Sequence, residues 1–119
     1  MAFKLAIADN IDFPVQLDIA DLGKRKTFKF HLQARRLSSD QARELVQGEG
    51  AYAGVTVDEF LRSHIIGWRE QRLVLDEAGQ PAAFGADAFD AMLAVTAVSS
   101  VIYGAYLNAL NAEGGKAKN

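Results

Sequence analysis

The sequence predicts a single α+β domain, mainly helical, in which an N-terminal β-hairpin is followed by about four helices. Apolar and polar residues alternate from residue 13 to residue 35, which is the period of a strand. From residue 38 onward, apolar residues recur at helical spacing behind capping sequences. The chain has 119 residues, and half of them are apolar, which is enough for one hydrophobic core. We assign residues 1–12 to an N-terminal extension, 13–113 to the domain and 114–119 to a disordered tail.

Two alternating runs and the turn between them predict the hairpin. The first run spans residues 13–22, and Pro14 lies near its start, where an edge strand tolerates the missing N–H. Gly23 lies in the turn that follows. One hairpin is marginal on its own, so we expect the helices to cover its apolar side. The second run places four residues on that side: Phe28, Phe30, Leu32 and Ala34.

Two capping boxes predict the starts of the first two helices. Ser38 and Gln41 begin the first helix. Thr56 and Glu59 begin the second helix, which helical spacing of apolar residues extends as far as Gly67. The residues with this spacing are Phe60, Leu61, Ile65 and Trp68.

The last two helices follow a predicted turn. We expect a short strand over residues 72–76 and then a third helix, capped by Gly85 with Asp87 in its first turn. Thr96 is expected to cap a last helix that runs to about Ala112.

The last helix is unusual because no charged residue occurs from Ala91 through Ala112. A helix that is apolar nearly all round is either buried on every side or in contact with a partner. A small domain cannot easily enclose such a helix, so we expect part of it to meet another chain. Aspartate at residue 106 or 110 should then leave the fold intact and abolish binding. The expected partner-binding residues are the large apolar ones, Tyr103, Tyr106, Leu107 and Leu110.

Composition argues against several classes of partner. A membrane span explains the uncharged last segment less well than contact with another chain does, because Thr96, Ser99 and Asn108 interrupt the apolar run. The formal charge of −2 gives no reason to expect nucleic acid or an acidic membrane surface as a partner. The chain has no cysteine, which excludes disulfides and thiolate metal sites. We therefore expect no nucleic acid, no membrane and no cofactor.

Catalytic residues are not indicated either. The two histidines, His31 and His64, have no neighbour at metal-binding spacing. The adjacent carboxylates at 58–59 and 76–77 have local explanations at a helix start and in a turn. We expect no metal site and no enzyme. A small enzyme or ligand-binding domain that uses His64 and Tyr103 in a pocket is kept as an alternative.

A second group of residues is expected to be structural. Trp68 is the only tryptophan, and it lies where the segments before and after it can close on its ring. We expect a structural hub made of Gly67, Trp68, Gly79, Pro81, Phe84 and Phe89.

The order of these features resembles a known family. A hairpin is followed by a capped helix that ends in Gly67-Trp68, then by Asp76, Gly79, Pro81 and Phe84, a short helix and a final helix rich in alanine and tyrosine. This order is similar to that of the small tail assembly chaperones of long-tailed bacteriophages and prophages, over roughly residues 13–110. Gly85 departs from the family, which often has serine there as a helix cap, although glycine is also an acceptable cap.

The resemblance implies a non-enzymatic role. Proteins of this family bind the long tape-measure protein in the host bacterial cytoplasm, keep it soluble and help recruit tail-tube subunits. They are absent from the mature virion, and many also occur in a longer, frameshifted form. The expected partners are thus the tape-measure protein and the tail-tube protein, with a homo-oligomer as an open option. The alternative is a minor structural or head–tail joining protein that stays in a phage or prophage particle.

Overall fold

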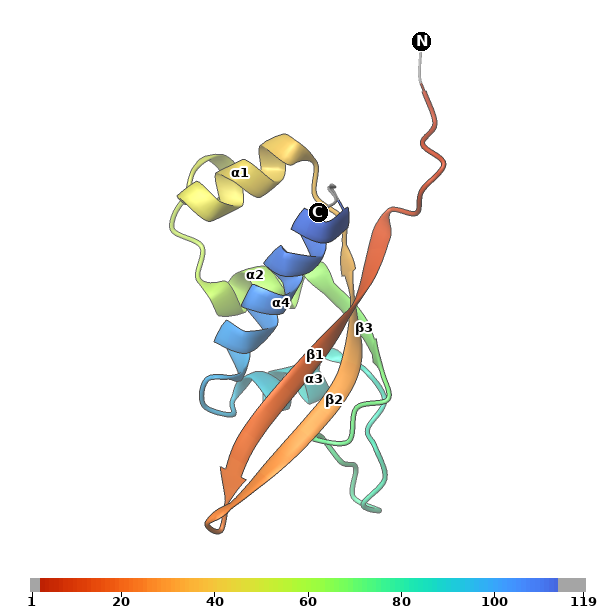
Figure 1. Ribbon diagram of the computed structural model, residues 1–119, viewed down its shortest axis with the longest axis vertical. Coiled ribbons are helices and arrows are strands. Elements are labelled where there is room, and N and C mark those ends of the chain that lie inside the picture. Colours follow the sequence, from red (N-terminus) through yellow and green to blue (C-terminus); the bar gives the residue numbers. More distant parts are fainter. Residues whose placement is uncertain (1–2, 114–119) are drawn as a thin grey trace.

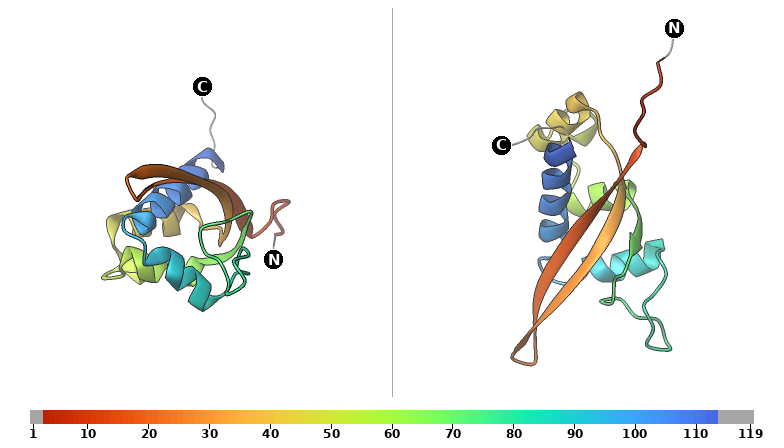
Figure 2. Two further views of the ribbon diagram at one scale, coloured as in Figure 1. Left: turned by 90° about the horizontal axis from the view of Figure 1, so that it is seen from below. Right: turned by 45° about the vertical axis from the view of Figure 1, so that its right-hand side comes forward.

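A long β-hairpin runs the length of the fold in the computed structural model, which describes residues 3–113 (Figure 1). Helices α2, α3 and α4 lie on one side of this hairpin, and α1 lies beside the end of α4 (Figures 1 and 2). The elements in chain order are β1 (Asn10–Asp21), β2 (Lys24–Arg35), α1 (Ser39–Gln47), the 3-10 helix η1 (Gly50–Tyr52), α2 (Val57–His64), β3 (Ile65–Arg69), α3 (Ala86–Leu93) and α4 (Val98–Glu113).

The hairpin is tight because two residues with positive φ connect its strands. Leu22 (φ 54°) and Gly23 (φ 80°) form the loop between them. Positive φ at both central residues is the property of a type I′ turn, which matches the twist of the flanking strands. The register then runs without interruption from Asp21–Lys24 to Asn10–Arg35. The predicted hairpin is therefore present, but β1 begins before the expected boundary at residue 13.

One face of the sheet forms the floor of the core. Alternate residues of β1 from Ile11 to Leu17, and of β2 from Phe30 to Ala34, are buried on this face, and Phe28 nearer the turn is partly buried. Helix α4 lies along β1, and α2 and α3 pack against α4. Seen from below, the hairpin curves around α4 (Figure 2). The two-residue period of the sequence places these side chains on one side, as predicted.

The prediction of a mainly helical fold is wrong, because the sequence analysis missed a third strand. Strand β3 pairs antiparallel with β2 through Gln33–Gly67 and His31–Arg69, and the sheet order is β1-β2-β3. Helices account for 39% of the structure and strands for 28%. The fold is therefore α+β without a dominant element type.

The third strand was missed because a bulge imitates helical spacing. Helix α2 ends at His64, and the next residue already belongs to β3. The pairing with β2 shifts its register beside Ala34, so both Ile65 and Trp68 turn toward the core although they are three residues apart. The β-branched pair Ile65-Ile66 and the following Gly67 also disfavour a helix. Spacing alone could not separate a bulged strand from another helical turn.

Both predicted capping boxes are present. The Ser38 side chain accepts from the Gln41 N–H at 3.1 Å, and the Gln41 side chain accepts from the Ser38 N–H at 2.9 Å. The same exchange joins Thr56 and Glu59. These local signals fix the starts of α1 and α2 because each box satisfies two donors that no helical carbonyl can reach.

Two other boundaries differ from the prediction. Residues 72–76 do not form a strand, and only an isolated bridge joins Leu75 to Pro81. Helix α4 begins at Val98 rather than behind a Thr96 cap, because Ala97 has φ 72° and interrupts the helical backbone. The tail predicted at 114–119 lies outside the described residues.

Candidate functional site

The inner side of α4 belongs to the core. Val98, Ile102 and Tyr106 follow one another at four-residue spacing and are all buried. The ring of Tyr106 meets Phe13 edge-on, with centroids 5.7 Å apart. Its hydroxyl donates to the backbone oxygen of Arg35 at 2.7 Å. Tyr106 therefore joins α4 to both strands of the hairpin and does not reach the surface that sequence reasoning assigned to it.

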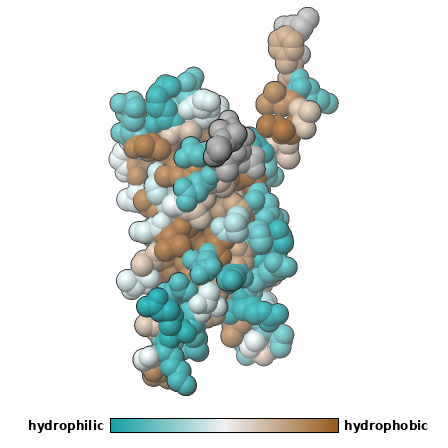
Figure 3. Space-filling view, in the orientation of Figure 1, coloured by the Kyte–Doolittle hydropathy of each residue, from teal (hydrophilic) through white to brown (hydrophobic). Residues whose placement is uncertain are grey.

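The other three predicted binding residues lie outside the buried stripe of α4: Leu110 shares a hollow with Ala42 of α1, and Tyr103 meets Phe60 of α2. Tyr103, Leu107 and Leu110 are partly buried against the core and partly exposed. Helix α1 has no buried residue of its own, so it offers apolar area beside this flank of α4 instead of filling the core. Apolar surface is visible in the middle of the face on which α4 lies (Figure 3). We call this area the α1–α4 surface; its residues are Leu37, Leu45, Tyr52, Tyr103, Leu107 and Leu110.

An aromatic cluster supports the α1–α4 surface from below. The ring of Phe60 is stacked on His64 at 4.1 Å and meets Tyr103 edge-on at 6.0 Å. Tyr52 from η1 meets the same ring at 5.8 Å. Because Phe60 packs against both His64 and Tyr103, these two side chains are parts of one packed cluster. This packing argues against the alternative in which they line a ligand pocket.

Burial shifts the pKa values of the titratable groups of this cluster toward their neutral forms. Burial lowers the pKa of His64, and the opposing hydrogen bond to the Phe60 carbonyl is the smaller effect. Burial likewise raises the pKa of Tyr103, and burial followed by the nearby Glu44 raises the pKa of Tyr52. The rings of this cluster suit contact with an apolar partner, because an uncharged ring is desolvated at low cost; the Glu44 carboxylate beside Tyr52 is a nearby charge.

The predicted hub forms a second aromatic cluster away from the α1–α4 surface. Trp68 on β3 meets Phe84 edge-on at 5.2 Å and Phe89 of α3 at 6.4 Å. The indole N–H donates to the backbone oxygen of Ala82 at 3.1 Å. These contacts attach the 71–84 loop and α3 to the edge of the sheet.

Sequence reasoning missed Gln71, the residue that pins this loop. Its side chain is 2% exposed. The amide nitrogen donates to the backbone oxygens of Val74 and Ala82, and the amide oxygen accepts from the N–H groups of Leu73 and Val74, all within 3.1 Å. A glutamine between Glu70 and Arg72 looks solvated in sequence. Its role depends on the loop closing around it, and no local sequence pattern predicts this burial.

Local geometry explains the glycines and the turn of the hub. Gly67 lies under the Gln33 side chain, where an added Cβ would come within 2.5 Å of the amide oxygen. Gly79 has φ 80° in the turn that Asp76 closes by accepting from the N–H groups of Ala78 and Gln80. Pro81 follows as one half of the bridge to Leu75. The motif that carries the family resemblance thus has structural reasons throughout.

The outer face of the sheet is polar and internally paired. Arg69 on β3 reaches across β2 to Asp12 on β1 with two contacts, at 3.1 and 3.2 Å. The hydrogen bond from Arg69 holds the pKa of Asp12 below its ordinary value. Gln33 donates to the same carboxylate at 3.4 Å. Because Arg69, Asp12 and Gln33 pair with one another, this part of the outer face is a poor candidate for binding an apolar partner.

Two further features bear on function. Among residues 3–113, no group of three or more histidine, aspartate and glutamate side chains is arranged to hold a metal ion. Within the same range, no helix on its own has the length and hydropathy of a membrane span. Ala86–Leu93 and Val98–Asn111 reach them only as a pair, with a bend of 106° between them.

Comparison of the chain with protein-family models, with curated proteins and with solved structures gave no match.

Proposed function

We propose that this protein is a non-enzymatic tail assembly chaperone of a phage or prophage. It binds the tape-measure protein in the host cytoplasm, helps to recruit tail-tube subunits and leaves before the virion is complete. The observation that carries this proposal is the α1–α4 surface, which combines a helix without buried residues and the partly exposed flank of α4, a helix with no charged residue before Glu113.

The α1–α4 surface has the chemistry that such a client needs. A long helical protein with apolar faces aggregates unless those faces are covered, and a helix commonly binds by laying its apolar face in a hydrophobic groove. Ala42 of α1 and Leu110 of α4 line one hollow, so the two helices border a shared depression. Tyr103 and Leu107 continue the apolar flank along α4. We assign client contact to this flank.

The internal role of α4 also limits which residues bind. Tyr106 holds the hairpin, and Phe60 holds the cluster under Tyr103, so neither is free to contact a client. Tyr103 and Leu107 are partly exposed, and large side chains of this kind dominate interface energies. These two residues should therefore contribute most to client binding.

The experiment is co-expression with a phage tape-measure protein. The wild-type chain should keep that protein in the soluble fraction, and a Tyr103→Ser/Leu107→Ser variant should lose at least about 90% of the recovery, which requires a complex at least about tenfold weaker. Leu75→Ser is the matched control, because Leu75 is 52% exposed on the 71–84 loop, away from α4. Equal recovery with the double variant and the wild type would refute the assignment.

Particle composition separates this function from the structural alternative. A chaperone should be missing from purified particles in quantitative mass spectrometry, whereas a minor tail or head–tail joining protein should be present in fixed copy number. Detection at a stoichiometric level would overturn the chaperone proposal and favour the structural one.

A further inference from the structure

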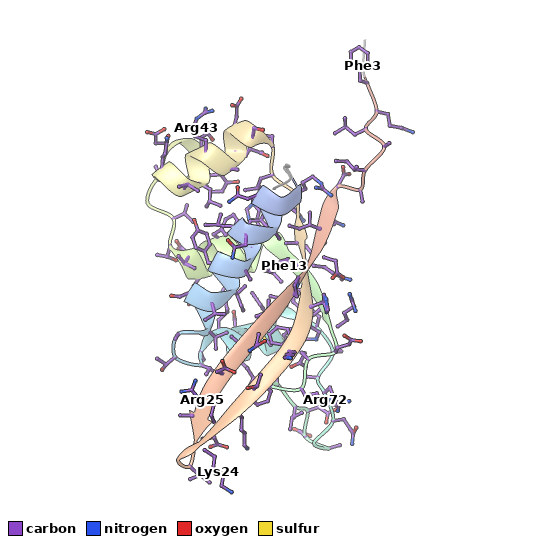
Figure 4. All side chains as sticks on the ribbon, in the orientation of Figure 1. Phe3, Phe13, Lys24, Arg25, Arg43 and Arg72 are labelled. Atoms are coloured by element: carbon purple, nitrogen blue, oxygen red, sulfur yellow. The ribbon has the colours of Figure 1, made fainter. Side chains whose placement is uncertain are left out.

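The segment before β1 leaves the body of the molecule with its apolar side chains in water. In this N-terminal arm (residues 3–9), Phe3, Leu5 and Ile7 are 88%, 74% and 57% exposed. The spacing is that of a strand, yet none of these residues pairs with the sheet. Figure 4 shows Phe3 at the far end of the arm, away from the helices and the sheet.

The base of the arm is held in place by Arg36. Its backbone N–H donates to the oxygen of Asp9 at 2.8 Å. Its guanidinium donates to the oxygens of Ala8 at 3.0 Å and Asn10 at 3.5 Å. The arm therefore leaves the body in a defined direction, which reduces the ordering cost of binding through it.

A hollow of about 490 Å³ lies beside this base, between α1 and the end of α4. Its apolar lining comes from Leu37, Ala42, Leu110 and Ile7, the last from the arm of the same chain. Its polar lining includes Ser38, Ser39 and Asn111, which are groups able to bond the backbone of an extended segment.

We propose that two copies of this chain associate by exchanging arms, so that Phe3 and Leu5 of each copy occupy the hollow of the other. Phe3 and Leu5 together offer roughly 300 Å² of exposed apolar area. One arm and the surface it covers would bury roughly 600 Å², which is the size of a weak contact. Two reciprocal arms bury roughly 1,200 Å², the lower end of the range for a standard specific interface. The area therefore favours a second copy, related by a twofold axis, over an unrelated partner that receives one arm.

The first test uses purified protein alone and does not rest on the proposed function. Sedimentation equilibrium should give twice the chain mass of 12.9 kDa for the wild type. The variant Phe3→Ser/Leu5→Ser/Ile7→Ser should dissociate at least about 100-fold more readily. Leu22→Ser is the control, because Leu22 is 98% exposed at the hairpin turn and lies outside the arm. A monomeric wild type, or a triple variant that dimerises normally, would overturn the proposal.

The second test asks whether the arm of one copy lies in the hollow of the other. It does not depend on the triple serine variant, so it is informative even if that variant folds poorly. The chain has no cysteine, so single introduced thiols report on one contact. A Leu5→Cys chain mixed with an Ala42→Cys chain should form a disulfide-linked pair on mild oxidation, and Leu22→Cys mixed with Ala42→Cys should not. Equal linkage in both mixtures would contradict arm exchange. So would concentration-independent closure within one Leu5→Cys/Ala42→Cys chain, which would show that the arm folds onto its own hollow.

Discussion

Replacing Tyr106 with phenylalanine tests whether this residue belongs to the core or to a binding surface. The substitution removes only the hydroxyl, which donates to the Arg35 oxygen at 2.7 Å from a fully buried side chain. A buried acceptor that loses its donor costs about 1–3 kcal/mol. Because the Arg35 side chain is exposed, water can partly replace the donor, and we expect a loss of about 1–2 kcal/mol. For a domain of this size the melting temperature should fall by roughly 3–10 °C.

Tyr103→Phe is the matched control for this measurement. Tyr103 lies on the same helix, is partly exposed, and its hydroxyl bonds to no other residue in the described part of the chain. Its loss should change the unfolding free energy by less than about 0.5 kcal/mol. Urea and thermal denaturation followed by circular dichroism give both values. Equal costs for the two substitutions would refute the assignment of Tyr106 to the core.

The aspartate substitution at the same position should be far more severe. Tyr106→Asp would place a carboxylate where the tyrosine ring now packs on Phe13, so we expect an unfolded or aggregated chain. This corrects the sequence-based expectation that Tyr106→Asp leaves the fold intact. A cooperative, near-wild-type melt of this variant would contradict the packing described here.

Three further substitutions test the sheet and the cluster. In Gly67→Ala the new Cβ meets the mobile end of Gln33, so urea denaturation should show a loss of at most about 1 kcal/mol, and none in a Gln33→Ala background. Burial lowers the pKa of His64, so below pH 6.5 the unfolded chain binds more protons than the folded one. The stability contributed by neutral His64 is therefore lost as pH falls through the folded pKa. His64→Gln should flatten that part of the pH–stability profile. The Arg69 hydrogen bond lowers the pKa of Asp12, so the stability contributed by the Asp12 carboxylate is present above pH 3.8 and is lost as pH falls through the folded pKa. Asp12→Asn should remove that acid-dependent loss of stability. Acid melts that neither charge substitution alters would contradict the assigned protonation states.

Local signals in the sequence were sufficient for the hairpin and the helix starts. The alternation of apolar and polar residues around Phe13 and Phe30 matches only a strand with those two side chains facing the core. The capping boxes at Ser38 and Thr56 satisfy backbone donors without help from distant residues. Structure that depends on long-range contacts was missed. Strand β3 forms because β2 offers an unpaired edge, and Gln71 is buried because a loop closes over it.

The sequence also did not indicate which side of α4 faces the core. With no charge between Ala91 and Ala112, the helix has no polar side to indicate which residues face outward. Tyr103 and Tyr106 therefore look equivalent in sequence. The hydrogen bond to Arg35, contributed by a strand far away in the chain, turns Tyr106 inward and leaves Tyr103 on the flank.

Hydrogen–deuterium exchange with and without the tape-measure protein tests the α1–α4 surface most directly. Helix α1 has no buried residue, so its amides should exchange quickly in the free protein, well ahead of those in β2. In the complex, α1 and the Tyr103–Leu110 part of α4 should slow at least about tenfold while the outer face of the hairpin is unchanged. Slowing confined to the hairpin or to the 71–84 loop, with α1 unaffected, would contradict the proposed surface.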